Sequence, residues 1–258
     1  MPEGDTIAYA AARMRPVLEG AVPEEIRTPH PRHRMDRWPQ RLGGRAVTEI
    51  RTHGKHLFIA FEGDYVLHSH LRMTGSWGVY PDGKRWRRAP RRAWLVLRRA
   101  GHEVVQFDGP LLELITEGRA RFDQRLAALG PDVLAAEFDY DDLLRRLRSD
   151  DQTRGIADAL LDQRNVAGIG NIWKAEGCWE AAVDPWRAVG AVTNDEVRAI
   201  LTGVRPRMLV SATRGRMDDE PRVFRRNGRP CPRCGTKILA RGQGDDNRTT
   251  FWCPGCQR

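Results

Sequence analysis

The sequence lacks the long apolar segments that a membrane-spanning protein needs. No run of about 18 or more apolar residues occurs in its 258 residues. The N-terminus also lacks the basic and then apolar layout of a secretory signal peptide. Internal repeats and low-complexity tracts are missing as well. We therefore expect a cytoplasmic protein that has no membrane partner.

Cysteine is scarce, and its distribution is uneven. Four of the five cysteines form two close pairs, whereas Cys178 stands alone among apolar residues. This usage fits reduced metal ligands better than disulfides. The seven histidines show no spacing typical of a ligand set, and we interpret His68 and His70 as hydrogen-bonded strand residues.

Positive charge is in excess. Lys and Arg number 43 against 34 Asp and Glu, which gives a formal charge of +9 and a pI of about 9.9. Such an excess favours a polyanionic partner, although many basic proteins bind no nucleic acid. Six of the basic residues crowd the stretch 84–92, which is either a solvated hairpin loop or an edge that faces phosphates.

The first half of the chain predicts one helix followed by antiparallel strands. Asp5 and Thr6 can cap a helix whose apolar positions recur until Gly20. The stretch 26–39, rich in Pro, His and Arg, is interpreted as a loop. Strands at hairpin spacing then indicate an antiparallel sandwich. The predicted strands are 46–51, 57–61, 65–70, 77–80, 93–99 and 104–107.

The second half predicts helices and a small cysteine-containing module. Apolar periodicity favours helices at 140–148 and 156–161, a third after Asn171, and a last one from Thr193 to about Ser211 that Pro206 kinks. Residues 213–229 form a long polar connection. The fold class is therefore α+β, with a β-sandwich domain (1–123), a helical domain (124–216), and a linker with a zinc-finger hairpin (217–258).

The cysteine pairs have the spacing of a structural zinc site. The pattern is Cys231-x2-Cys234-x18-Cys253-x2-Cys256, in which each pair chelates and the residues between the pairs form a hairpin. Four thiolates complete a tetrahedral shell and leave no open position for catalysis. We expect one structural Zn²⁺ per chain, on which this small hairpin depends for folding.

The start of the chain carries possible nucleophilic chemistry. Removal of Met1 would leave Pro2 with a secondary amine, and α-amino groups titrate near pH ~8. Such an amine attacks aldehyde-like carbons to form an iminium ion, with Glu3 beside it as a proton carrier. Alternatively, Pro2 is only a permissive second residue and Glu3 a solvated charge.

Several motifs occur in one order along the whole chain. They are Met1-Pro2-Glu3-Gly4, Gly54-Lys55, Asp162-Gln163, Gly168-Ile169-Gly170-Asn171 and the four cysteines. Together they resemble the formamidopyrimidine-DNA glycosylase and endonuclease VIII family of DNA repair enzymes. The resemblance implies that Pro2 attacks the sugar C1′ of a damaged nucleotide, that Glu3 assists ring opening, and that Lys55 contacts phosphate at the lesion. No metal or redox cofactor takes part in that chemistry.

The resemblance also implies residues that bind DNA. Asn171 matches an asparagine of the helix-two-turn-helix element that binds phosphates, although it is also a possible helix N-cap. Arg248 matches the zinc-finger arginine that contacts the same region. Met73 matches a wedge that fills the gap left by a flipped base, the alternative being a core methionine. The Arg-x-Phe pair of the purine-specific branch is missing from 106–112, which favours the endonuclease VIII branch.

The resulting hypothesis is a monomeric, nucleoid-associated base excision repair enzyme. It would remove oxidised bases, pyrimidines above all, from damaged duplex, single-stranded or bubble DNA, and then cleave the strand by β,δ-elimination. Three alternatives remain. They are an oxidised-purine glycosylase, a catalytically silent zinc-dependent DNA-binding protein, and a tautomerase with an N-terminal proline base.

Overall fold

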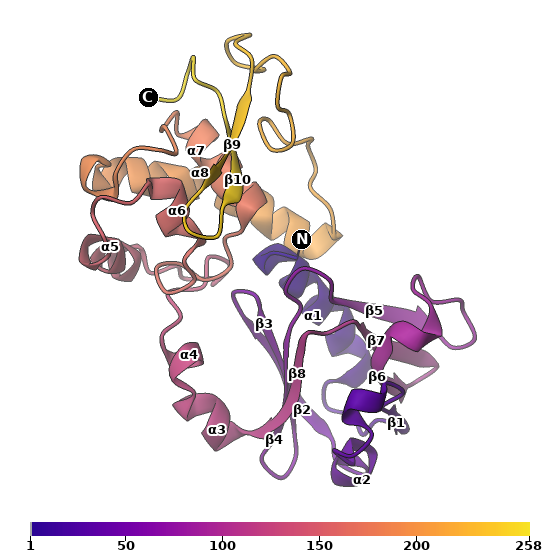
Figure 1. Ribbon diagram of the computed structural model, residues 1–258. Coiled ribbons are helices and arrows are strands. Elements are labelled where there is room, and N and C mark those ends of the chain that lie inside the picture. Colours follow the sequence, from indigo (N-terminus) through magenta and orange to yellow (C-terminus); the bar gives the residue numbers. More distant parts are fainter. Residues whose placement is uncertain (1) are drawn as a thin grey trace. The chain divides into compact units, whose positions relative to one another are not determined.

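The computed structural model describes residues 2–258, so the predicted removal of Met1 lies outside the described residues. The chain forms two compact units, coloured from indigo to yellow along the sequence in Figure 1. Unit 1 contains Pro2 and residues 6–127, and unit 2 contains residues 3–5 and 128–258. Among the described residues, no helix is both long enough and apolar enough to cross a bilayer.

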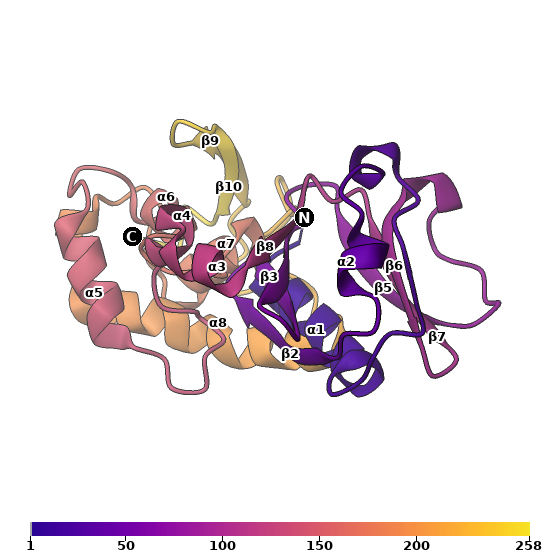
Figure 2. The ribbon, with the colours of Figure 1, turned by 90° about the horizontal axis from the view of Figure 1, so that it is seen from below.

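Unit 1 is built on two four-stranded antiparallel sheets. One sheet has the order β2-β3-β4-β8 and the other β1-β6-β7-β5, and Figure 2 shows β5, β6 and β7 gathered apart from β2, β3 and β8. The strands are β1 (Glu25–Arg27), β2 (Val47–His53), β3 (His56–Phe61), β4 (Tyr65–His70), β5 (Ser76–Pro81), β6 (Ala93–Arg99), β7 (His102–Phe107) and β8 (Leu111–Thr116). The helices are α1 (Gly4–Leu18), α2 (Trp38–Leu42), α3 (Glu117–Phe122) and α4 (Gln124–Ala127).

Alternation along the strands explains the core of unit 1. In β3, Leu57, Ile59 and Phe61 are buried in one cluster with residues of α1 and of both sheets, whereas Phe58 packs in another cluster on the opposite face. A strand presents successive side chains to opposite faces, so this strand is buried on both sides. The two sheets with their shared core confirm the predicted antiparallel sandwich.

Two predictions about unit 1 are wrong. The stretch 26–39 interpreted as a loop overlaps the end of β1, which pairs with β6, and the start of α2, whose Trp38 is buried. A three-residue strand is too short to show alternation, and Pro39 is tolerated in the first turn of a helix. β8 was missed because its leucine-rich sequence shows no clear period of two. Asp5 and Thr6 lie inside α1 and do not cap it.

Unit 2 contains four helices and a β-hairpin. They are α5 (Tyr140–Ser149), α6 (Ile156–Leu161), α7 (Asn171–Glu180), α8 (Asn194–Arg214), β9 (Leu239–Gln243) and β10 (Arg248–Trp252). Thr193, the predicted start of this helix, is the N-cap of α8 and forms a reciprocal capping box with Glu196. The helix continues past Pro206 and ends three residues beyond the predicted Ser211, where Gly215 adopts φ 72°.

The cysteine-containing module packs on α7. Ala175 and Trp179 of this helix share a small core with Val223, Ile238 and two of the cysteines. Asn171 Nδ2 and Lys174 Nζ add hydrogen bonds to residues of β10. The hairpin therefore packs its apolar residues against α7, because its own residues do not form a separate core.

Candidate functional site

The carboxylate of Glu3 is fixed at the N-terminus of α7. Its Oε1 accepts the backbone N–H of Ile172 at 2.8 Å, and its Oε2 accepts that of Trp173 at 3.4 Å. The residue is only 1% exposed. Free N–H groups and the positive end of the helix dipole favour a charged carboxylate at this position. Glu3 is therefore fixed at the start of α7, directly after a Pro2 that remains partly exposed.

A glycine-containing turn receives the residues next to Glu3. Gly4 N–H donates to Gly168 O at 2.9 Å, and a Cβ on Gly4 would lie 2.9 Å from Gly168 Cα. Gly168 has φ +102°, a conformation that favours glycine. Gln163 braces the turn, since its Oε1 accepts Gly168 N–H and its Nε2 donates to Ile169 O, both at 3.0 Å. The segment around 168–170 is thus shaped by close backbone contact.

Asn171 joins α7 to the hairpin. Its Nδ2 donates to Thr249 O at 2.8 Å, while its buried Oδ1 has no hydrogen-bond partner among residues 2–258. The alternative interpretation of Asn171 as the N-cap is wrong, because Gly170 occupies the cap position. Arg248, the neighbour of Thr249, begins β10 after the hairpin turn, and its Nε lies 3.6 Å from Asp246 Oδ2. The structure thus brings together Glu3, Asn171 and the start of β10.

Lys174 is a buried amine that the sequence analysis missed. Its Nζ donates to Thr250 Oγ1 at 2.7 Å, and the residue is 1% exposed. Burial lowers the pKa of Lys174 to about 8, although Cys178, Asp158 and Glu3 act in the opposite direction. Residues 173–179 are all buried, so helical periodicity carries no signal that could distinguish this side chain.

Glu176 organises the polar connection before the first cysteine and was also missed. Its Oε2 accepts the N–H of Arg222 at 2.8 Å, and its Oε1 accepts those of Val223 and Phe224 at 3.0 and 3.1 Å. Arg207 lies 3.4 Å from the same carboxylate. Three backbone donors and one guanidinium compensate a charge that is fully buried.

Lys55 lies in the tight turn between β2 and β3, where Gly54 has φ +56°. A chain of hydrogen bonds crosses the sheet beside this turn. His56 Nδ1 and His68 Nε2 are 2.8 Å apart, and His68 Nδ1 lies 2.9 Å from Glu113 Oε1. Their positions, one each on β3, β4 and β8, follow from the strand register. Spacing along the sequence could not show this arrangement.

The imidazoles of His56, His68 and His70 are neutral at physiological pH. Burial lowers the pKa of His56 to about 2, with a further contribution from His70. The pKa of His70 is lowered to about 4 by burial and then by Lys55. With Glu113 accepting from His68 Nδ1–H, neutral His68 must accept from His56 Nδ1–H. The hydrogen bonds therefore have a fixed direction, and neither His56 nor His70 carries an imidazolium charge next to Lys55.

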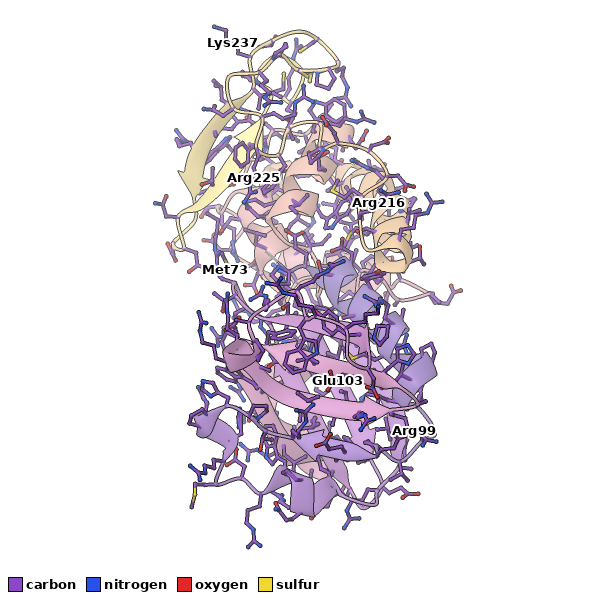
Figure 3. The ribbon with its side chains drawn as sticks, turned by 90° about the vertical axis from the view of Figure 1, so that its right-hand side faces the viewer. Met73, Arg99, Glu103, Arg216, Arg225 and Lys237 are labelled. Carbon is purple, nitrogen blue, oxygen red and sulfur yellow. The ribbon has the colours of Figure 1, made fainter. Side chains whose placement is uncertain are left out.

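Met73 projects from a turn between β4 and β5. It is 58% exposed, and Figure 3 shows its side chain at the surface of unit 1. The alternative of a core methionine is therefore wrong. The turn is fixed by Arg72 N–H donating to His70 Nδ1 at 3.1 Å and Gly75 N–H donating to Leu71 O at 2.9 Å.

The four predicted cysteine ligands converge. Their Sγ atoms all lie within 4.8 Å of one another, with Cys231 and Cys256 at 3.8 Å and Cys234 and Cys253 at 3.3 Å. A tetrahedral zinc ion with Zn–S bonds of about 2.3 Å requires sulfurs roughly 3.8 Å apart. These separations exclude disulfides, whose S–S length is about 2.05 Å. The donor set fits a metal ion of this kind.

The surroundings of the thiols suit metal binding as well. Burial raises the pKa of the Cys231 thiol, but hydrogen bonds from Trp179 and from the Arg233 backbone outweigh it, and the pKa is about 6. For Cys256, burial and then the neighbouring thiols raise the pKa to about 12. A bound cation would favour all four thiolates, and binding would release protons.

The predicted site residues divide between the units. Pro2, Lys55 and Met73 belong to unit 1, whereas Glu3, Asn171, Arg248 and the cysteines belong to unit 2. The peptide bond between Pro2 and Glu3 links the groups covalently.

Comparisons with known proteins agree with this arrangement. The family model of the formamidopyrimidine-DNA glycosylase N-terminal domain matches residues 1–124, and that of the formamidopyrimidine-DNA glycosylase H2TH domain matches residues 129–217. Lactococcus lactis Fpg (MutM), solved in a complex with DNA that contains N7-benzyl-Fapy-dG, has the same fold. It gives a TM-score of 0.83 at 23% identity over 100% of both chains.

Relatives match along the full length of the chain. "Probable endonuclease 8 2" of Streptomyces coelicolor is 39% identical over 100% of this chain and 94% of its own. "DNA-(apurinic or apyrimidinic site) lyase Nei2" of Mycolicibacterium smegmatis is 35% identical over 100% and 99%. With a β-sandwich, a helical unit and a four-cysteine hairpin in the matching order, the chain belongs to the formamidopyrimidine-DNA glycosylase and endonuclease VIII family.

Proposed function

We propose that this protein is a bifunctional DNA glycosylase and abasic-site lyase of base excision repair, with Pro2 as its nucleophile. The observation that supports the proposal is the position of the Glu3 carboxylate at the N-terminus of α7. A buried carboxylate with two backbone N–H partners fixes the residue after Pro2, while Pro2 itself stays partly exposed. A nucleophile held in place but open to substrate is what attack on a sugar carbon requires.

In the proposed mechanism, the Pro2 nitrogen attacks C1′ and the damaged base leaves with the electrons of the glycosidic bond. The sugar ring then opens as its oxygen accepts a proton, which leaves an iminium ion between Pro2 and C1′. Glu3 carries that proton. The iminium acidifies the C2′ proton, and successive eliminations expel the two flanking phosphates. Lys55 contacts the phosphate at the lesion, among neutral imidazoles that do not compete for it.

The DNA-binding roles are part of the same proposal. Asn171 and Arg248 hold phosphates that flank the lesion, and Asn171 Nδ2, which donates one N–H to Thr249 O, has a second N–H that can donate to a phosphate oxygen. Met73 fills the space of the extruded base, for which its exposure suits it. We propose that the protein acts as a monomer on damaged DNA in the cytoplasm, at the nucleoid.

We further propose that the four thiolates hold one structural Zn²⁺. When bound, the metal would supply folding free energy to the hairpin and no catalytic step. Cys231, Cys234, Cys253 and Cys256 would hold it, with Trp179 donating to the Cys231 sulfur at 3.3 Å. The division into domains 1–123, 124–216 and 217–258 belongs to this proposal, with the metal module as the third domain.

Oxidised pyrimidines are the proposed substrates. Relatives named as endonuclease 8 support this preference, as does the lack of an Arg-x-Phe pair at 106–112. An oxidised-purine glycosylase remains the second candidate, and a panel of substrates separates the two. A catalytically silent DNA-binding protein is the third.

One experiment tests the chemistry. The protein is incubated with borohydride and oligonucleotides that contain thymine glycol, 5,6-dihydrouracil, 8-oxoguanine or an abasic site. We expect a covalent adduct with the abasic site and with both pyrimidine lesions, and none when a permanent extension blocks Pro2. An adduct with 8-oxoguanine alone would favour the purine alternative. Absence of any adduct would leave a DNA-binding protein without this activity.

A further inference from the structure

The loop between β5 and β6 carries a dense set of cations. Its basic residues are Lys84, Arg85, Arg87, Arg88, Arg91 and Arg92. Asp108 pairs with Arg88 at 2.6 Å and with Arg92 at 2.7 Å. The side chains of the other four are exposed, and none has a hydrogen bond, ion pair or ring contact with another described residue. Four cations of this loop are therefore left without a compensating anion in unit 1.

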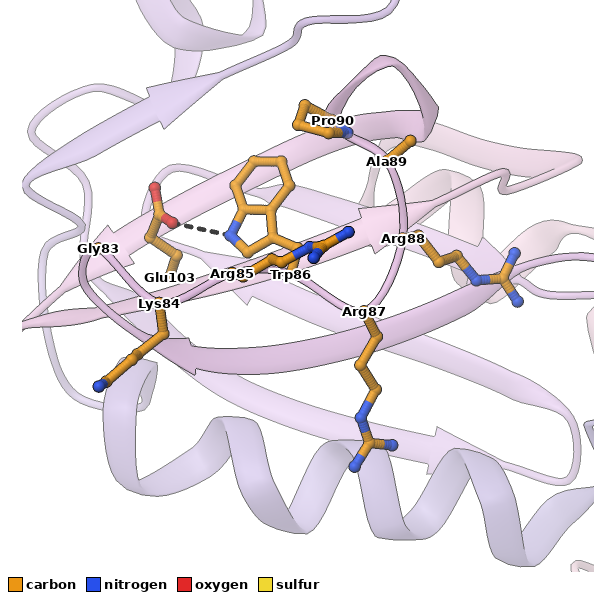
Figure 4. Close-up of a pocket in the computed structure, with 9 residues that line it drawn as sticks. All are labelled: Gly83, Lys84, Arg85, Trp86, Arg87, Arg88, Ala89, Pro90 and Glu103. Carbon is orange, nitrogen blue, oxygen red and sulfur yellow. Dashed lines mark hydrogen bonds between the residues drawn. The ribbon is translucent and has the colours of Figure 1, made fainter.

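Trp86 holds the loop in place from within. Its indole N–H donates to Glu103 Oε2 at 2.9 Å, and its ring meets Phe107 edge-on at 5.7 Å between centroids. Figure 4 shows the indole directed at Glu103, while Lys84, Arg87 and Arg88 extend away from it on different sides. Because the Trp86 side chain contacts Glu103 and Phe107 of β7, it anchors the loop to the sheet and does not serve as a ligand-binding surface.

The loop is also tied to the turn that carries Met73. Arg88 Nη1 donates both to Thr74 O at 2.8 Å and to Asp108 Oδ2 at 2.6 Å. Thr74 Oγ1 in turn donates to Asp108 O at 3.5 Å. Arg88 and Asp108 thus join the basic loop, the end of β7 and the turn at Met73. Arg88 therefore ties the end of the loop nearest β6 to that turn, and the four unpaired cations extend from the same loop.

A hollow of about 720 Å³ opens against the loop, lined by residues 83–90 and Glu103. Its only carboxylate, Glu103, is already engaged by Trp86 and by Arg27 at 2.5 Å. Guanidinium groups bind phosphate oxygens through paired N–H donors. A protein partner would need an apolar anchor at the centre of the contact, and the hollow offers only Ala89 and Pro90 besides the committed indole.

We propose that the loop 84–91 is a second phosphate-binding surface, which grips the sugar-phosphate backbone of a nucleic-acid strand next to the Met73 turn. Several cations spread over one loop suit a polymer of phosphates better than a single anion. The surface binds backbone and reads no base, because the unpaired side chains are flexible cations. The identification of the strand as DNA rests on the proposed function.

The test measures how salt affects binding. Full-length protein is titrated against 25-base-pair duplexes, undamaged or with a tetrahydrofuran abasic analogue, from 50 to 200 mM KCl. We expect Arg85→Ala/Arg87→Ala to lower the slope of log K against log salt by about 1.8, since each phosphate contact contributes ~0.9. Both duplexes should be affected equally. Arg85→Lys/Arg87→Lys should restore the slope.

A matched control removes the same charge elsewhere in unit 1. Arg34→Ala/Arg121→Ala also deletes two exposed arginine side chains that contact no other described residue through a hydrogen bond or ion pair, and it should leave the slope unchanged. An unaltered slope for the loop variant, or an equal loss in the control, would overturn the inference. Borohydride trapping is run in parallel. A changed slope without any adduct would refute the proposed chemistry and leave the phosphate surface standing.

Discussion

Gly170→Ala tests the contact between the Glu3 side chain and the start of α7 without altering any functional group. A Cβ at this position would lie 2.6 Å from Glu3 Oε1 and closer still to Cγ and Cδ. The backbone of Gly170, at φ −126° and ψ −165°, is extended and available to alanine. Alanine is less favourable than glycine at an N-cap by about 1 kcal/mol. The rest of the effect comes from displacement of the Glu3 carboxylate.

The size of the effect follows from the bonds that are lost. The N–H groups of Ile172 and Trp173 would lose their acceptor, and each buried unsatisfied group costs about 1–3 kcal/mol. The bond to Trp173 is long, so we place the total at about 3 kcal/mol. Urea unfolding of unit 2 should show this loss. Thermal unfolding should show it as roughly 2–4 °C per kcal/mol.

A double-mutant cycle with Glu3→Ala decides the cause. If the alanine acts through Glu3, adding Gly170→Ala to Glu3→Ala should cost only the N-cap preference of about 1 kcal/mol, which leaves a coupling of about 3 kcal/mol. Gly118→Ala is the control, because its Cβ would meet only Thr116 Oγ1 at 3.9 Å. Additive losses, or a Gly170→Ala protein as stable as the parent, would refute the reasoning.

Three further predictions concern the metal site and two buried bases. Metal analysis should find one zinc per chain, which a chelator removes with a fall in melting temperature, and Cys256→Ser should retain less metal. Burial lowers the pKa of His56 to about 2, so the unfolded chain binds an extra proton below about pH 6.5. The free energy of unfolding should therefore fall by up to ~1.4 kcal/mol for each unit that the pH drops below 6.5. In urea titrations, His56→Gln should weaken this pH dependence. Burial lowers the pKa of Lys174 to about 8, so stability should rise from about pH 8 towards the ordinary lysine value of ~10.4, and Lys174→Met should abolish that rise.

Local signals sufficed for much of the fold. Gly63 and the Ala100-Gly101 pair adopt positive φ, as hairpin turns require, and so the predicted strands fell close to the observed ones. The capping box of Thr193 and Glu196 likewise follows from residues three apart. The cysteine spacing indicated a metal site because chelation imposes short loops, and the thiols do converge.

The remaining features depend on contacts between distant residues. Glu3 and Ile172 are 169 positions apart, so no pattern near the N-terminus reveals that the carboxylate caps another helix. The chain from Glu113 through His68 to His56 needs the register of three strands. β1 was missed because an edge strand of three residues owes its conformation to its partner β6 and not to its own sequence.

The helix α7 has a different contact at each of its ends. Its first turn holds Glu3, and Trp179 near its last turn donates to the Cys231 sulfur. A helix of ten residues is about 15 Å long, so one short rigid rod spans both. Linkage between two sites is reciprocal. Oxidation of the thiol cluster should thus weaken the contact between Glu3 and α7. Conversely, loss of the Glu3 contact should lower the affinity of the thiol cluster for a metal ion.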